Sequence, residues 1–147
     1  MKLSTKGRYG TRVLLDLAIH FGEGPVLLRD IAEREHISLS YLEQIVGILV
    51  AAKMVRSLRG TRGGVWLAKN PREIKLSDAV QVLEGSFVPV DCINDPDACS
   101  RSEFCVTRDL WTELKTAMDG VLESTTLQDL VERHKRKEMA STKIYQI

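Results

Sequence analysis

Apolar residues recur at intervals of three and four along several segments, the spacing that places side chains on one face of a helix. The first segment spans residues 11–21, and the second begins at Leu27. The third spans residues 40–52 and follows Ser38, a suitable N-cap. A fourth follows Ser77 as its N-cap and ends at Gly85. The pattern predicts four helices, the second and third joined by a short turn.

Between the third and fourth helices, the pattern changes to that of a hairpin. Residues 54–58 and 65–68 read as two short strands around the glycine-rich segment 59–64. The segment and its first strand hold Arg56, Arg59 and Arg62, which can reach phosphates or a narrow minor groove. We therefore expect a two-stranded wing with basic side chains at its tip.

The solvent-facing side of the third helix is polar near its N-terminus. It carries Ser40, Tyr41, Glu43 and Gln44, in the position where a recognition helix meets base edges in the major groove. Taken alone, this stretch is equally compatible with an ordinary solvated helix face. The adjoining arginine wing favours DNA binding, because glutamine can pair with adenine and arginine can enter a minor groove.

A longer amphipathic segment spans residues 107–124. Leu110, Leu114, Ala117 and Val121 form a heptad-like seam on it. So wide an apolar face on one helix needs a partner, and helix-turn-helix proteins generally read paired half-sites as dimers. A capping box at residues 126–129 then predicts a short helix ending at Val131, followed by a charged, flexible tail.

Charge is unevenly distributed along the 147 residues. Residues 1–70 hold 11 Lys and Arg against 6 Asp and Glu, and residues 71–147 hold 10 against 14, so the halves carry +5 and −4. A basic half suits a polyanion, because lysine and arginine contacts to phosphate supply most non-specific affinity for nucleic acid. We expect Ser4 and Lys6 to contact backbone phosphates.

All three cysteines, Cys92, Cys99 and Cys105, lie within 14 residues. Soft thiolates bind iron–sulfur clusters and zinc, and the gaps are looser than those of a zinc knuckle, which favours a cluster over zinc. Thiol-based redox sensing or inert cysteines stay open. Three thiolates leave the fourth coordination position of the cluster open. An exogenous small ligand could fill it, or one of the chain's carboxylates and histidines: Asp91, Asp95, Asp97, Glu103, His20, His36 and His134.

The expected fold is mostly α. We expect a winged helix-turn-helix domain at residues 1–85, a cysteine-bearing loop at 86–106, a dimerisation helix with a short C-terminal helix at 107–131, and the tail at 132–147. No segment approaches a membrane span and the start lacks a signal-peptide core, so we expect a cytoplasmic protein without a membrane partner. No histidine lies within 28 residues of a cysteine and no phosphate loop is present, which argues against an enzyme.

Three stretches resemble the Rrf2 family of bacterial winged-helix regulators. They are residues 2–9 (KLSTKGRY), residues 37–44 (ISLSYLEQ) on the recognition helix, and residues 59–64 (RGTRGG) in the wing. The three cysteines and the ending at residues 126–131 (TLQDLV) resemble the branch of iron–sulfur cluster regulators, IscR. The resemblance covers most of the chain.

The resemblance implies a homodimeric transcriptional repressor or activator that reads a double-stranded DNA operator with Ser40, Glu43, Gln44 and Arg59. It implies an iron–sulfur cluster, usually [2Fe–2S], on the cysteines, iron–sulfur assembly proteins as cluster donors, and assembly genes as targets. In such proteins a histidine follows the last cysteine by three residues, but here Arg108 stands there.

Two other branches of the family provide alternative functions. One is a cluster-free regulator of cysteine metabolism that senses thiol oxidation or a partner protein. The other is the nitric-oxide sensor type, which uses an acidic residue from the first helix where this chain has Arg8.

Overall fold

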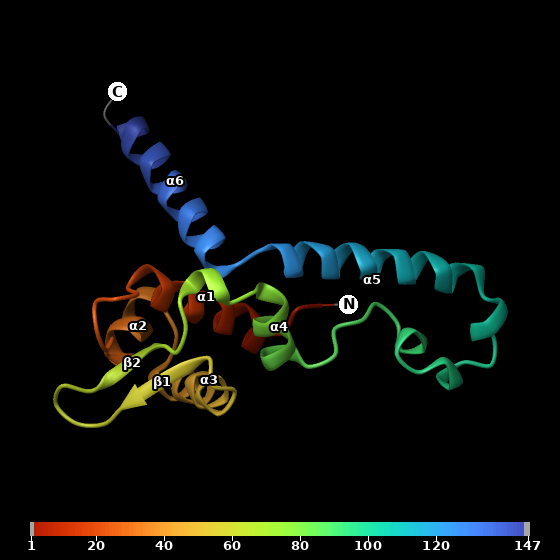
Figure 1. Cartoon of the computed structure of the whole chain (residues 1–147), viewed down its shortest axis with the longest axis horizontal. Coiled ribbons are helices and arrows are strands. Elements are labelled where there is room, and N and C mark those ends of the chain that lie inside the picture. The colour runs from red at the N-terminus through yellow and green to blue at the C-terminus, as the bar shows by residue number, and fades with distance from the viewer. Residues whose placement is uncertain (1, 146–147) are drawn as a thin grey trace.

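The computed structural model describes residues 2–145 (Figure 1). Within these residues, one two-stranded antiparallel sheet accompanies the α-helices. In chain order the elements are α1 (Thr5–Ile19), α2 (Leu28–Glu35), α3 (Leu39–Ala51), β1 (Val55–Leu58), β2 (Gly64–Leu67), α4 (Leu76–Glu84), α5 (Val106–Ser124) and α6 (Leu127–Tyr145). This mostly helical fold confirms the fold class expected from the sequence.

The core gathers around α1, which contacts α2, α3, α4, α6 and β2. Leu14 and Leu17 of α1 are fully buried with Leu42, Ile45 and Leu49 of α3. Burying each such side chain contributes roughly 1.5–3 kcal/mol, so the helices predicted from apolar spacing are held by one common core.

The turn between α2 and α3 is short, as expected. His36 ends α2 in the left-handed conformation (φ 53°), and Ser38 caps α3 by accepting a hydrogen bond from the Tyr41 amide at 3.3 Å. Asp16 of α1, 4% exposed, accepts two 2.8 Å hydrogen bonds from the Arg34 guanidinium. This ion pair fixes α2 against α1 and thereby sets the direction of α3.

Two helix starts differ from the prediction. We expected α1 to begin near residue 11, but it begins at Thr5, where the Ser4 hydroxyl accepts from the Gly7 amide at 3.0 Å. We also expected Ser77 to cap α4, but the N-cap is Lys75 and Ser77 lies inside the helix. Lys75 makes no side-chain cap, so the sequence carried no capping signal there.

The joint between α5 and α6 is tied to the entrance of α4 by backbone hydrogen bonds. The Leu76 amide donates to the Thr125 carbonyl at 2.8 Å, and the Leu127 amide donates to the Ile74 carbonyl at 2.9 Å. Leu127 and Val131 are buried against the core. The two long helices therefore leave the domain from a fixed point (Figure 1).

The predicted end of the C-terminal helix was wrong. We expected it at Val131, but α6 continues to Tyr145; residues 146–147 lie outside the described part. Residues 132–144 are mostly charged or polar, and their large apolar residues, Met139 and Ile144, are exposed. The sequence therefore lacks the apolar spacing that signals a packed helix there. Among residues 2–145, no helix is long and apolar enough to cross a membrane.

Candidate DNA interface and cysteine loop

The solvent-facing stripe of α3 consists of Ser40, Glu43, Gln44 and Gly47, all exposed. At Gly47, nothing lies within 4 Å of the position that a Cβ would occupy. The opposite side of the helix is fixed in the core by Leu42, Ile45 and Leu49. The stripe is therefore a rigidly supported surface that is free along its length, with its polar side chains near the helix N-terminus.

Tyr41, the remaining residue expected to read DNA from α3, is placed differently. It is half-buried, and its ring makes an edge contact with the Tyr9 ring of α1, with centroids 6.1 Å apart and an 80° angle between planes. The Arg8 and Arg12 guanidiniums lie 5.8 and 5.3 Å from the Tyr9 centroid. Tyr41 thus braces α3 against α1, and a base contact from it stays a prediction.

The arginine-bearing hairpin forms as expected. β1 pairs with β2 from Val55 opposite Leu67 to Leu58 opposite Gly64. At the tip, Gly60 adopts φ 110°, and a Cβ at Gly63 would come within 2.1 Å of the Leu58 carbonyl oxygen. These two positions need glycine, and they allow the tight turn that displays Arg59 and Arg62, both exposed.

At the N-terminus, Ser4 already has partners within the chain. Besides capping α1, its hydroxyl hydrogen-bonds the Glu84 carboxylate of α4, which also accepts from the Ser4 amide at 3.2 Å. Lys6 is exposed and makes no ion pair with another described residue. The structure gives Ser4 a structural role, while phosphate contacts from Ser4 and Lys6 stay predictions.

The cysteine segment connects α4 to α5 through short 3-10 turns. Cys92 and Cys105 are half-buried and Cys99 is exposed. The turns span Asp91–Ile93, Pro96–Ala98 and Ser102–Phe104. In the described part of the chain, no three Cys, His, Asp or Glu side chains are gathered closely enough to hold a metal ion. The thiols therefore share one segment but are not assembled into a single site.

Cys105 and Cys92 meet the same end of α5. Cys105 is the N-cap residue of α5, and its sulfur lies 3.2 Å from the Thr107 hydroxyl oxygen. That hydrogen bond, together with one from the Arg108 backbone, lowers the pKa of the Cys105 thiol, which favours the thiolate that binds soft metals. Arg108 also donates a hydrogen bond from Nε to the Cys92 carbonyl at 3.2 Å. Its side chain therefore ties the backbone at Cys92 to the first turn of α5.

The three histidines lie on other elements. His20 Nδ1 lies 2.8 Å from the Asp16 carbonyl oxygen at the end of α1, His36 ends α2, and His134 on α6 lies 3.3 Å from Glu138. The candidate carboxylates Asp91, Asp95, Asp97 and Glu103 stay on the cysteine segment and are exposed. The donor chemistry of three thiols fits an iron–sulfur cluster, while no fourth ligand is marked by the arrangement.

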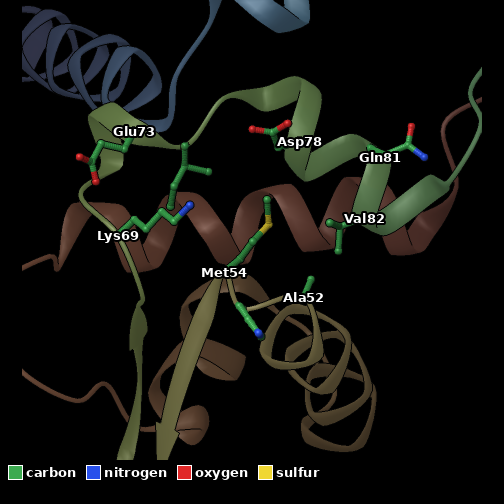
Figure 2. Close-up of a pocket in the computed structure, with 9 residues that line it drawn as sticks. Ala52, Met54, Lys69, Glu73, Asp78, Gln81 and Val82 are labelled. Atoms are coloured by element: carbon green, nitrogen blue, oxygen red, sulfur yellow. The ribbon is translucent and has the colours of Figure 1, made fainter.

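A hollow of about 490 Å³ lies between the end of α3 and α4 (Figure 2). Met54 and Val82 contribute apolar side chains to it, with Lys69 on the strand side and Asp78 on α4. None of the residues expected to bind DNA or metal lines this hollow. It is distinct from both the α3 stripe and the cysteine segment.

Sequence reasoning missed the residues that support the interface rather than form it. Tyr9 braces Tyr41, and Arg12 bonds Glu35 of α2, with Nε 2.9 Å from its carboxylate. The only signal was an aromatic residue followed three positions later by an arginine, one turn apart on the same helix face. That spacing is too common to identify a function.

Comparison with known proteins agrees with this arrangement. The Rrf2 model, described as an iron-dependent transcriptional regulator, matches residues 3–133. The protein rrf2 of Nitratidesulfovibrio vulgaris is 43% identical over 131 residues, which cover 89% of this chain and 87% of that protein. Among solved structures, T. potens IscR is 44% identical with a TM-score of 0.75, covering 91% of this chain and 88% of its own. CymR, the global cysteine regulator of B. subtilis, is 41% identical with a TM-score of 0.77, covering 90% and 98%.

The helix-turn-helix, the exposed stripe of α3 and the arginine wing define a winged-helix, DNA-binding transcriptional regulator. The chain belongs to the Rrf2 family. Its relatives are transcriptional regulators, and both IscR and CymR lie at similar distances from it. The expected family and fold are therefore confirmed, while the similarity alone favours neither relative.

Proposed function

We propose that this chain is a homodimeric transcriptional regulator that reads its operator with the α3 stripe and the wing, and senses iron–sulfur cluster status through its cysteines. The observation that carries the proposal is the exposed stripe of Ser40, Glu43 and Gln44 beside the arginine tip. Base edges are read by such side chains from a helix in the major groove, and arginine at a wing tip suits the narrow minor groove.

Base recognition is tested in two steps. Duplexes that the protein binds are first selected from a random-sequence pool, and the dissociation constants of protein variants are then measured on the selected operator and on its single-base changes. Gln44→Ala should lose about 1–3 kcal/mol of discrimination at one base pair, because it removes a base-edge contact. Lys135→Ala, at an exposed position of α6, is the matched control and should keep the discrimination. An operator preference that is unchanged in Gln44→Ala would contradict the proposed reading.

For the cysteines, we propose that Cys92, Cys99 and Cys105 hold an iron–sulfur cluster of the [2Fe–2S] type, received from iron–sulfur assembly proteins. The support is the donor chemistry of three thiols in one segment, with the pKa of Cys105 lowered by its hydrogen bond to Thr107. When bound, a cluster supplies an iron centre that is sensitive to redox state and to cluster supply.

We propose that cluster binding to this segment changes how α5 is arranged relative to the winged-helix domain. The segment 86–106 is the link between α4, which packs on α1, and α5, and Arg108 ties its start to the first turn of α5. Fixing the three thiols together would fix this link. DNA binding changes only by the difference in affinity between the two arrangements, and we propose iron–sulfur assembly genes as the targets.

The first experiment is an ultraviolet–visible spectrum with iron and sulfide analysis on anaerobically purified protein. We expect charge-transfer bands with near-stoichiometric iron and sulfide per chain, both lost in Cys92→Ser, Cys99→Ser and Cys105→Ser. Ser100→Ala, an exposed change on the same segment, should keep them. Colourless wild-type protein that also resists reconstitution would contradict the cluster and leave the DNA-binding proposal standing.

A cluster-free regulator is the second candidate. Two observations favour it: the thiols are not gathered among the described residues, and CymR is as similar to this chain as IscR is. In that case the cysteines would sense oxidation, or the acidic segment would bind a partner protein. Iron-free protein whose DNA affinity changes reversibly with thiol oxidation would establish this candidate over the cluster.

A further inference from the structure

A second hollow, of about 610 Å³, lies between the end of α3 and the strands of the hairpin. Lys53, Arg56 and Lys69 line it together with Trp66. Arg56 and Trp66 are directly opposite each other across the two strands, so they share the face of the sheet that points away from buried Val55 and Leu67. The lining of this hollow thus combines three cationic side chains with one half-buried indole.

No acidic residue lines this hollow. The three cations are exposed, and none forms an ion pair with any residue between 2 and 145. Two carboxylates, Glu73 and Asp78, line the adjoining hollow between α3 and α4, which Lys53 and Lys69 also line. Like charges held in one concave surface raise its positive potential and attract anions.

Lys53 occupies a backbone position that favours glycine. Its φ is 62°, in the left-handed region, which non-glycine residues adopt at a cost. The turn that it makes joins α3 to β1, with the Lys53 amide donating to the Val50 carbonyl at 2.9 Å. Glycine at this position would relieve the strain, so the charge of Lys53 can be removed without destabilising the turn.

The hollow lies next to the proposed interface along the chain. Val50, on its lining, lies one turn beyond Gly47 of the α3 stripe, and Arg56 lies on the strand that leads to Arg59 at the tip. α3 and β1 pack side by side, with the wing tip beyond them (Figure 1). When α3 lies in the major groove and the wing lies in the adjacent minor groove, the sugar-phosphate strand that separates the two grooves passes between α3 and the wing.

We infer that this hollow is a backbone channel, in which Lys53, Arg56 and Lys69 bind DNA phosphates between the grooves occupied by α3 and the wing. The inference rests on the proposed DNA-binding function and adds a contact that neither the stripe nor the tip supplies. Phosphate contacts position a protein on DNA without reading sequence, so the channel adds affinity and fixes register.

The test measures the affinity of the full-length protein for a mixed-sequence 30-base-pair duplex over a range of NaCl concentrations. The slope of log K against log salt is negative, and each lost phosphate contact should reduce its magnitude by about 0.9. We expect Arg56→Gln and Lys69→Gln each to flatten the slope by about that amount per bound protomer. Lys135→Gln makes the same charge change at an exposed position of α6, a helix that points away from α3 and the wing (Figure 1), and should leave the slope unchanged.

Arg59→Gln is included to separate this inference from the proposed function. If Arg59→Gln weakens binding while Arg56→Gln and Lys69→Gln behave like Lys135→Gln, the channel is contradicted and the DNA-binding proposal stands. If the wild type fails to bind the duplex at low salt, both are overturned. Thermal unfolding of each variant checks that these exposed changes leave the fold intact.

Lys53→Gly separates a role in binding from a role in the turn. Glycine relieves the left-handed strain, so the unfolding midpoint should stay the same or rise, while affinity for the duplex falls several-fold and the salt slope flattens. Lower stability with unchanged affinity would show that Lys53 serves the turn and would overturn its assignment to the channel.

Discussion

Glu43 is the single acidic residue of α3, and it lies on the exposed stripe that we propose to face DNA. A carboxylate in a groove is repelled by phosphate unless it accepts a hydrogen bond from a cytosine amino group. Its place between Ser40 and Gln44 suits such a contact. The Glu43 charge would then lower the affinity for most operators, but not for those with a cytosine at the base pair that it contacts.

We predict that Glu43→Ala relaxes operator choice rather than weakening binding uniformly. Operators with cytosine opposite residue 43 should lose about 1–3 kcal/mol of preference, while other sequences bind more tightly because the repulsion is gone. Dissociation constants on a panel of single-base operator variants measure this. The same change in affinity on every operator would count against a selective role.

Among single residues, the exposure of Gln44 and Arg59 could be predicted from the sequence, whereas the bracing contacts could not. That Gln44 and Arg59 bind DNA stays a prediction. Gln44 and Arg59 were visible because polar positions on an apolar helix and arginines beside glycines are local patterns. The edge contact of Tyr41 with Tyr9 joins residues 32 positions apart in two helices, and one sequence does not reveal which helices meet. Likewise, nothing local indicated that Ser4 would bond Glu84.

Among the elements, α1 and α4 approach each other closely because α1 has glycines on the contact face. A Cβ at Gly10 would lie 2.5 Å from a methyl carbon of Leu83, which is fully buried, and a Cβ at Gly7 would meet the Glu84 carboxylate. Glycine lowers helix propensity, which is why the first turns of α1 were not predicted from the sequence. Packing, rather than propensity, explains the helix there.

We therefore predict opposite stability effects for two helical glycines. Gly10→Ala should lower the free energy of unfolding, because overpacking a core contact costs about 1–3 kcal/mol and exceeds the gain in helix propensity. Gly47→Ala, where nothing lies within 4 Å, should raise it by about 0.5–1 kcal/mol. Urea unfolding at neutral pH measures both. A stabilised Gly10→Ala variant would show that α1 and α4 can separate without cost.

The start of α6 is a capping box that should make stability depend on pH. The Thr126 amide donates to the Asp129 carboxylate at 2.9 Å, and the Asp129 amide donates to the Thr126 hydroxyl at 3.2 Å. The backbone hydrogen bond from Thr126 is the main reason that the pKa of Asp129 is lowered. This capping box was predicted from the sequence, whereas the length of the helix after it was not.

Because the folded pKa of Asp129 is depressed, its contribution is present above the unfolded pKa and is lost as pH falls through the folded pKa. We predict that Asp129→Asn is less stable than the wild type at neutral pH and that the difference shrinks under acid. Chemical unfolding of both proteins at a series of pH values from neutral to strongly acid measures this. A difference independent of pH would assign the effect to the side-chain shape rather than to the charge.

In the whole molecule, α5 extends away from the winged-helix domain (Figure 1), and its apolar side chains are not covered by the described part of the chain. None of its residues is buried; Leu110 is 53% and Val121 64% exposed. The bounds of α5 were predicted within a residue because its heptad-like spacing is strong. What covers that side is not encoded locally, and we propose a second copy, which would place two α3 stripes on one duplex.

We predict that Leu110→Glu converts the dimer to monomers. The change acts twice in a twofold interface, and losing two buried leucines costs about 3 kcal/mol or more, a factor of about 100 or more in the dissociation constant. Sedimentation velocity at micromolar concentration measures the state, and Thr112→Glu, on the other side of α5, is the matched control. Monomers should occupy a single half-site, so affinity for a two-half-site operator should fall in parallel with dimerisation. Dimers that persist in Leu110→Glu would show that another surface joins the two copies, and the seam would then need a different occupant.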